Sequence, residues 1–361
     1  MSMRAFFFWE AGGDLRLGGR SNQYGALLAR SLRRHDIHLE PGDYAFGADW
    51  LERSRPEYSV LHLNWLDRFY TQGGPEGALG EYARFAETLI HARRIGYRVV
   101  WTLHNLFPHE RPHPELDRLV NLLVAREADA VIAHCRYGAE QLTRRYGVES
   151  VHVIPHGHFM DVFPDEVTRP AARARLGIED GRFVYVFFGN LRGYKGLEEL
   201  VDAYREIARP EDLLILMMKT NARAPGLLER VAAAARAARS IRIETSDFFP
   251  EEEFQYYLNA ADVAVLPFRE VMTSGSAIQA LGFGLPVVLP RRGCMADLID
   301  GSMGVLYEPD EPGALPEAMR RARGMDLQAA GRAARARAQQ FDWNDIGDRI
   351  AALYRGAGDA R

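Results

Sequence analysis

The sequence predicts an α/β protein of two doubly wound domains, each a parallel sheet with helices on both faces. Short, continuous apolar runs alternate with longer amphipathic segments, as strands buried on both faces alternate with crossover helices. This alternation stops at a connection that bears Pro, His and Gly, and then it starts again. The length of 361 residues accommodates two domains of ordinary size.

Each expected strand of the first half is a short apolar run bounded by polar residues or glycine. The N-terminal run is too short for the h-region of a signal peptide, so we expect it to form the first strand. The expected strands of this half are residues 4–9, 60–64, 99–103, 130–133 and 151–154, and the expected helices are residues 24–34, 80–94, 116–127 and 138–146.

The pattern restarts after the connection at residues 156–170. We expect a first domain at residues 1–163, a second at 164–340, and a closing helix and tail at 341–361. The closing helix is amphipathic and is expected to pack back on the first domain. The expected strands of the second half are residues 183–188, 213–218, 241–244, 263–266 and 287–290, and the expected helices are residues 196–207, 227–238, 251–260 and 276–283.

The composition is that of an ordinary globular protein. Forty-five basic residues nearly balance 49 acidic ones, for a net charge of -4. Nucleic-acid binders usually carry a strong basic excess, so we expect no nucleic-acid partner. No apolar run reaches the 18 residues or so that span a membrane. We expect a cytoplasmic protein, with peripheral contact of the basic segments 30–34 and 91–98 to the inner face of the membrane as a further option.

Two turns of the second half have the character of an anion site. The first follows the expected strand at 263–266 and opens a helix of small and apolar residues. The first N–H groups of a helix lack internal partners and carry partial positive charge, so they bind anions. The second turn follows the strand at 183–188 and supplies a planar guanidinium and a compact ammonium. We expect a phosphate or diphosphate at Thr273, Ser274, Gly275, Ser276, Arg192 and Lys195.

The structural alternatives to this site are a helix N-cap at the first turn and a solvated pair of basic side chains at the second. Neither turn by itself distinguishes these from an anion site.

Four segments of the second half, in order, resemble the nucleotide-binding domain of glycosyltransferase family 4 and its relatives. They are residues 187–197, 260–267, 267–288 and 301–309, and residues 101–105 and 153–157 of the first half match more loosely. The resemblance implies the GT-B fold, in which two Rossmann-like domains face each other across a cleft. It assigns the nucleotide sugar to the second domain and the acceptor to the first.

The activity implied by the resemblance is transfer of a sugar from a UDP- or GDP-linked donor to a hydroxyl of a glycan or lipid-linked saccharide, as in polysaccharide biosynthesis. Basic side chains and helix amides would neutralise the departing diphosphate, so we expect neither a metal nor a cofactor. A non-catalytic GT-B partner or binding subunit and a nucleotide-sugar epimerase are the alternatives. The oligomeric state is not predicted.

The chain departs from the family at one position pair. Many retaining members carry two glutamates with seven residues between them across the first turn, and here Val271 and Gln279 stand at those positions. The resemblance implies that Gln279 bonds the ribose and that Glu270, one residue early, bonds hydroxyls of the donor sugar. The stereochemistry stays open, with inversion favoured.

The first domain is expected to supply the acceptor site and a general base. Gly13 lies in a glycine-rich loop whose backbone could approach the diphosphate, with a flexible surface loop as the alternative. His104 follows a strand end, and in the family a histidine there contacts the donor sugar. His109 and Glu110 are further candidates for the base. The aromatic residues expected to stack on the acceptor are Trp65 and Tyr70, with core packing as the alternative.

Overall fold

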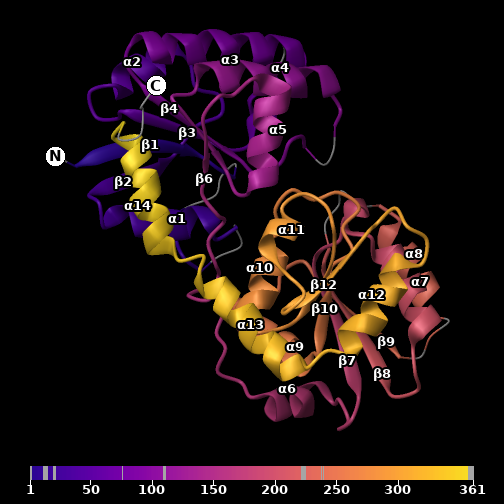
Figure 1. Cartoon of the computed structure of the whole chain (residues 1–361). Helices are drawn as coiled ribbons and strands as arrows, with labels where there is room; N and C mark the ends of the chain where they lie inside the picture. Colours follow the sequence, from indigo (N-terminus) through magenta and orange to yellow (C-terminus); the bar gives the residue numbers. More distant parts are fainter. Residues whose placement is uncertain are drawn as a thin grey trace. The chain divides into compact units, whose positions relative to one another are not determined.

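The structure is a computed structural model, and it describes residues 2–10, 15–18, 22–74, 76–108, 111–220, 225–236, 238 and 240–356. The chain divides into two compact units, Met1–Gly157 with Asp342–Arg361, and His158–Phe341. The boundary between them lies within the expected connection at residues 156–170. The predicted α/β class and the doubly wound sheets are confirmed in both units (Figure 1).

Unit 1, as we call the first of these, contains a parallel sheet of six described strands in the order β2-β1-β3-β4-β5-β6. Helices α1 and α14 cover one face, and α2, α3, α4 and α5 cover the other (Figure 1). The strands are β1 (Met3–Phe8), β2 (Ile37–Pro41), β3 (Val60–Leu63), β4 (Arg98–Leu103), β5 (Ala130–Ala133) and β6 (Val151–Val153). The helices are α1 (Tyr24–Arg33), α2 (Ala48–Ser54), the 3₁₀ turn η1 (Leu66–Phe69), α3 (Gly77–Arg94), α4 (Pro114–Glu127), α5 (Arg136–Tyr146) and α14 (Trp343–Tyr354).

Unit 2, the second, contains a parallel sheet of six described strands in the order β12-β11-β10-β7-β8-β9. Helices α7, α8 and α12 cover one face, and α6, α9, α10 and α13 cover the other (Figure 1). The strands are β7 (Phe183–Asn190), β8 (Asp212–Lys219), β9 (Ile241–Ser246), β10 (Val263–Val265), β11 (Val287–Pro290) and β12 (Gly304–Tyr307). The helices are α6 (Arg169–Leu176), the 3₁₀ turn η2 (Gly193–Lys195), α7 (Leu197–Ile207), α8 (Leu227–Ala235), α9 (Glu251–Ala260), α10 (Gly275–Gly282), α11 (Met295–Leu298), α12 (Ala314–Arg323) and α13 (Leu327–Gln339).

The closing helix α14 packs on α1 and so completes unit 1, as predicted. The two helices approach closely because α14 has a glycine where it faces α1. A Cβ added at Gly347 would lie 1.9 Å from Ser31 Oγ. The Ser31 hydroxyl in turn donates to the carbonyl of Trp343. Glycine is also required at Gly157, where an added Cβ would lie 2.2 Å from Cε2 of Trp343. The helix is therefore fixed by backbone-to-side-chain fit as well as by its apolar face.

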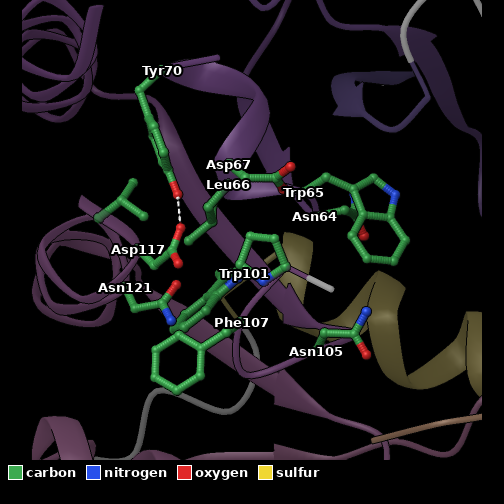
Figure 2. A pocket seen from close by; sticks show the side chains of 12 residues that line it. Asn64, Trp65, Leu66, Asp67, Tyr70, Trp101, Asn105, Phe107, Asp117 and Asn121 are labelled. Carbon is green, nitrogen blue, oxygen red and sulfur yellow. Dashed lines mark hydrogen bonds between the residues drawn. The ribbon is translucent and has the colours of Figure 1, made fainter. Parts of the chain in front are cut away.

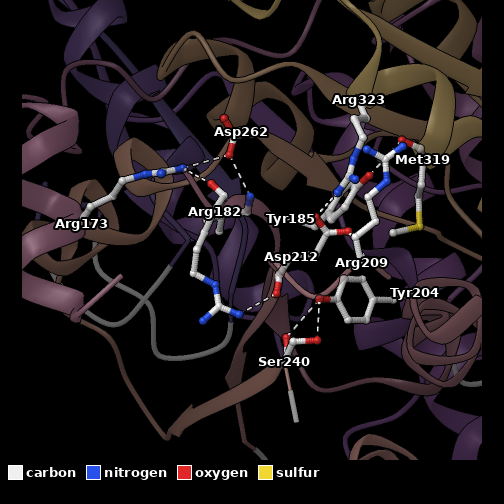
Figure 3. Close-up of polar contacts among 11 residues, drawn as sticks. Arg173, Arg182, Tyr185, Tyr204, Arg209, Asp212, Ser240, Asp262, Met319 and Arg323 are labelled. Carbon is white, nitrogen blue, oxygen red and sulfur yellow. Dashed lines mark hydrogen bonds and ion pairs between the residues drawn. The ribbon is translucent and has the colours of Figure 1, made fainter. Parts of the chain in front are cut away.

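A buried carboxylate ties the helices of unit 2 to its sheet (Figure 3). Oδ2 of Asp262, at the start of β10, accepts from Arg173 Nη2 at 3.0 Å and from the backbone N–H of Val184 at 2.8 Å. Arg169 donates to the other carboxylate oxygen. Asp262 and Arg173 are both more than nine-tenths buried, so the Arg173 guanidinium depends on this carboxylate for its counter-charge.

None of the helices in the described ranges combines the length and the apolarity that a membrane span requires.

Candidate functional site

Two loops of unit 2 meet at the carboxyl edge of its sheet. The first follows β7 and the second follows β10, and these strands are neighbours although they are far apart in sequence. The chain leaves β7 towards β8 and β9 and returns to build β10, β11 and β12 on the other side. Open α/β sheets bind their ligands at such a point of reversal.

The two loops are in direct contact. The backbone N–H of Arg269 donates to the carbonyl of Tyr194 at 2.8 Å. Gly196 has a φ of 68°, and a Cβ added to it would lie 2.0 Å from the carbonyl oxygen of Pro267. Only glycine fits there, and its absence of a side chain lets the β7 loop lie against the end of β10.

The two loops bring Lys195 and Ser276 to the same glycine. A Cβ built on Gly189 would lie 3.5 Å from Ser276 Oγ and 3.9 Å from Lys195 Nζ. The Lys195 ammonium also lies 4.4 Å from the ring centre of Phe268. Burial lowers the pKa of Lys195 from 10.5 to about 8. Within the described ranges no carboxylate pairs with this ammonium. A desolvated cation beside a hydroxyl and an open backbone is suited to hold an anion.

The start of α10 lies at this same place. The Ser274 side chain accepts from the backbone N–H of Ala277 at 3.1 Å, so the N-cap interpretation of this serine is correct. Its hydroxyl is occupied by the helix, whereas Gly275 and Ser276 begin the helix with their N–H groups at its positive end. Thr273 is half-buried directly before the cap, and Arg192 is half-buried at the start of η2.

Gln279 lies one turn further along α10. Its side chain is 9% exposed, and its Nε2 atom is buried with no hydrogen-bond partner among the described residues. It lines a pocket of unit 2 together with Phe159, Phe163 and Arg335. A buried amide without a partner costs about 1–3 kcal/mol, so this pocket favours a ligand oxygen. Glu270, by contrast, is exposed on the loop before α10.

His104 belongs to a buried imidazole and aromatic cluster at the carboxyl edge of unit 1. Its Nε2 lies 2.9 Å from Asn64 Oδ1, and its Nδ1 lies 3.3 Å from Nε2 of His134. The Trp65 ring stacks on it, with 5.0 Å between ring centres. Burial, and then the neighbouring histidines, hold the pKa of His104 well below its usual range. His104 is therefore a neutral, firmly oriented group at physiological pH.

A pocket opens beside this cluster, at the ends of β3 and β4 (Figure 2). Trp65 is half-buried at its wall, whereas Tyr70 is 1% exposed and its hydroxyl donates to Asp117. Asp117 also accepts from Arg111 Nε at 3.0 Å. Tyr70 is thus a core residue whose hydroxyl bonds a buried carboxylate, which agrees with the core-packing alternative. Polar lining residues that the sequence analysis did not single out are Asn64, Asp67 and Asn105. Their positions just after two strands were the available signal.

Gly13, His109 and Glu110 lie outside the described residues.

Comparison with known proteins identifies both halves of the chain. Residues 182–323 match the family model "Glycosyl transferases group 1", and residues 46–159 match "Glycosyltransferase Family 4". The chain is 29% identical over 304 residues to GDP-mannose:glycolipid 4-beta-D-mannosyltransferase of Xanthomonas campestris pv. campestris, covering 80% of this chain and 77% of that one. It is 30% identical over 324 residues to D-inositol 3-phosphate glycosyltransferase of Geodermatophilus obscurus, covering 85% of this chain and 69% of that one.

Solved structures agree on the fold. Sucrose-phosphate synthase from Thermosynechococcus elongatus superposes with a TM-score of 0.76 at 19% identity, over the whole of both chains. Anabaena HepE, solved in complex with UDP, superposes with a TM-score of 0.75 at 17% identity, over 99% of this chain and 100% of that one. The predicted GT-B fold and glycosyltransferase activity are confirmed. The chain belongs to the group 1 and family 4 glycosyltransferases and is a hexosyltransferase of the GT-B fold.

Proposed function

We propose that this glycosyltransferase moves a sugar from a UDP- or GDP-linked donor to a hydroxyl of a glycan or lipid-linked saccharide. The observation that carries the proposal is the Lys195 ammonium, which is desolvated beside Gly189 and Ser276 Oγ and pairs with no carboxylate in the described ranges. A buried cation is costly unless a counter-charge accompanies it. The diphosphate of a nucleotide sugar is such a counter-charge.

The same groups suit the chemistry of transfer. When the bond from the anomeric carbon to the diphosphate breaks, negative charge grows on the leaving oxygen. Lys195, Arg192 and the N–H groups at Gly275 and Ser276 would stabilise that charge from fixed positions, without a metal or cofactor. Thr273, directly before the helix cap, completes this proposed diphosphate site.

For the rest of the donor we propose two contacts. The unpartnered Nε2 of Gln279 would donate to a ribose hydroxyl, and the exposed Glu270 would accept from hydroxyls of the donor sugar. With Val271 and Gln279 in place of the glutamate pair, we favour inversion of the anomeric centre.

Inversion requires a base on the side of the acceptor. The ring nitrogens of His104 already lie within bonding distance of Asn64 and His134, which argues against this residue as the base. We therefore propose that His109 or Glu110 takes the proton of the acceptor hydroxyl.

We place the acceptor in the pocket of Figure 2. The enclosed part of the pocket has a volume of about 30 Å³, room for about two waters, so the sugar residue would lie at its open mouth. The Trp65 ring would pack on the apolar face of that sugar, and Asp67 and Asn105 would bond its hydroxyls.

The charge of this pocket favours a neutral acceptor. Among the described residues that line it none is basic, and two are acidic: Asp67, and Asp117, whose charge is paired with Arg111. A phosphorylated acceptor would meet like charge there, so we propose a neutral saccharide, free or on a lipid. Peripheral contact with a membrane would follow from a lipid-linked acceptor and is part of this proposal.

The proposal is tested by incubating the full chain with UDP- and GDP-linked sugars, together with a neutral glycolipid, a neutral oligosaccharide or an inositol phosphate. We expect release of nucleoside diphosphate and a new glycoside with a neutral acceptor, unchanged by a chelator. NMR of the anomeric coupling in the product tests inversion.

Two outcomes would overturn it. Failure to release or bind any nucleoside diphosphate would indicate a non-catalytic subunit of this fold. Conversion of the donor sugar to an epimer, independent of any acceptor, would indicate an epimerase.

A further inference from the structure

The chain uses lysine at two positions only. Of its 45 basic residues, Lys195 and Lys219 are the lysines, and arginine occupies all the others. Both lysines lie in unit 2, at the carboxyl edge of the same sheet: Lys195 in the loop after β7, and Lys219 as the last residue of the neighbouring strand β8. A compact ammonium distinguishes these two positions from the other basic residues of the chain, which carry a planar guanidinium.

Lys219 lies beside the proposed diphosphate site. It is opposite Asn190 of β7 in the register of the sheet, and its carbonyl accepts from the N–H of Leu191 at 2.8 Å. The loop that carries Arg192 and Lys195 follows β7 and therefore starts beside the end of β8. Neighbouring strands are about 5 Å apart, so a ligand at Lys195 extends past Lys219 if it continues towards β8.

The surroundings of Lys219 resemble those of Lys195. Its ammonium lies 5.4 Å from the ring centre of Phe248 and 5.5 Å from that of Phe254. Burial lowers its pKa, and the charge of Glu251 opposes that shift. No carboxylate lies within ion-pair distance of it in the described ranges. Lys219 is thus a second partly buried cation that is free to donate to a ligand.

On the other side of β7, after strand β11, the described basic side chains are not available to a ligand in this way. Arg291 and Arg292 follow β11, and their side chains are already paired with Glu308 and Asp310. Among the described residues, a nucleoside attached to a diphosphate at Lys195 would find an unpaired ammonium beside an aromatic ring on the side of β8 and β9. Phe248, in the loop after β9, supplies that ring.

We propose that Lys219 reads the base of the donor nucleotide and that this base is guanine. The Hoogsteen edge of guanine presents two adjacent acceptors, O6 and N7, to which an ammonium can donate together. Uracil presents a single carbonyl at its corresponding edge. This inference rests on the proposed function, because it assumes that the diphosphate binds at Lys195.

The test is titration calorimetry of the full chain with GDP, UDP and 7-deaza-GDP, which lacks the N7 acceptor. We expect the wild type to bind GDP more tightly than UDP and 7-deaza-GDP. Lys219→Met should weaken GDP binding about 5- to 160-fold, the equivalent of 1–3 kcal/mol, and should bind GDP and 7-deaza-GDP equally. Arg205→Met, which removes an exposed cation of α7, is the control and should leave all three affinities unchanged.

The inference is overturned if the wild type binds GDP and 7-deaza-GDP equally, if it prefers UDP, or if Lys219→Met weakens both purine nucleotides by the same factor. The last result would assign Lys219 to a phosphate. Should Lys219→Met unfold, Lys219→Gln keeps the volume without the charge and is titrated in its place. If no nucleotide binds and Lys195→Met changes nothing, the proposed function itself fails. If binding depends on Lys195 but is indifferent to Lys219, only the present inference fails.

Discussion

Replacing Lys195 with methionine should weaken nucleotide binding and stabilise the unliganded protein at the same time. Methionine keeps the length and apolar stem of the side chain, so it preserves the contact with Phe268. It removes the ammonium that approaches Gly189 and Ser276 Oγ. Hydrogen bonds to charged groups contribute about 1.5–3 kcal/mol, so the dissociation constant for a nucleoside diphosphate should rise about 10- to 150-fold.

The opposite effect on stability follows from the lowered pKa. Burial brings the pKa of Lys195 down to about 8, which means that the folded protein holds the charged form at a cost. At pH 7 the methionine variant no longer bears that cost, so its melting temperature without ligand should exceed that of the wild type. A lysine with a purely structural role would give the reverse result.

The pH dependence of binding has a definite sign. Below pH 8 the ammonium is protonated before the nucleotide arrives, so this group makes affinity no more than weakly dependent on pH there. As pH rises above about 8 the free site loses its proton, and affinity should fall towards tenfold per pH unit. Calorimetric titrations at pH 7, 8 and 9, on the wild type and on Lys195→Met, measure both effects. A dissociation constant within twofold of the wild type for the variant, or no decline from pH 8 to 9, would refute the reasoning.

Three further predictions concern stability. Asp262→Ala leaves the Arg173 guanidinium buried without its partner and should cost about 3–5 kcal/mol in urea unfolding followed by circular dichroism. The exposed Asp202→Ala should cost less than about 1 kcal/mol, and equal losses in the two variants would contradict this account. Gly347→Ala should destabilise unit 1 by about 1–3 kcal/mol, with partial rescue by Ser31→Gly and no effect of Gly47→Ala, where an added Cβ meets nothing within 4 Å. Finally, burial lowers the pKa of His62 and His156 to about 3 and that of His134 to about 4. Below pH 6.5 these histidines are therefore protonated in the unfolded chain while they stay neutral in the folded unit. Unit 1 should therefore lose stability from pH 6.5 down to about 3. Tryptophan fluorescence reports unit 1 alone, because all five tryptophans of the chain lie in it, and an unchanged urea midpoint between pH 7 and 5 would count against the buried neutral histidines.

The sequence predicted elements that are buried throughout, such as a central strand, or along one face of a helix. Strand β11 and helix α9 have the predicted bounds, residues 287–290 and 251–260. Strand β2 was not predicted, because it lies at the edge of the sheet and alternates: Ile37 and Leu39 are buried, and His38 is exposed. A strand that is covered on one side only does not present the continuous apolar run on which the prediction depended.

The candidate site was predictable where it follows from topology and not where it follows from side-chain partners. The loops with Lys195 and Ser276 come after parallel strands, and such loops meet at one edge of the sheet. The bonds of His104 to Asn64 and His134, and of Tyr70 to Asp117, join residues 30 to 47 positions apart. Such partners depend on the packed core, and no local pattern in the sequence encodes them.

The return of α14 to unit 1 constrains the order in which the protein can be made. Residues 342–361 complete a unit whose other part ends at Gly157, and the whole of unit 2 is encoded between them. During synthesis unit 2 can fold before α14 has been made, and until then α14 does not cover the apolar side of α1. Unit 1 is thus completed after unit 2, although β1 is synthesised before any strand of unit 2. A ribosome that stalls after unit 2 would release a chain in which Tyr24 lacks its ring contact with Trp343, and chaperones and proteases recognise such exposed apolar surface.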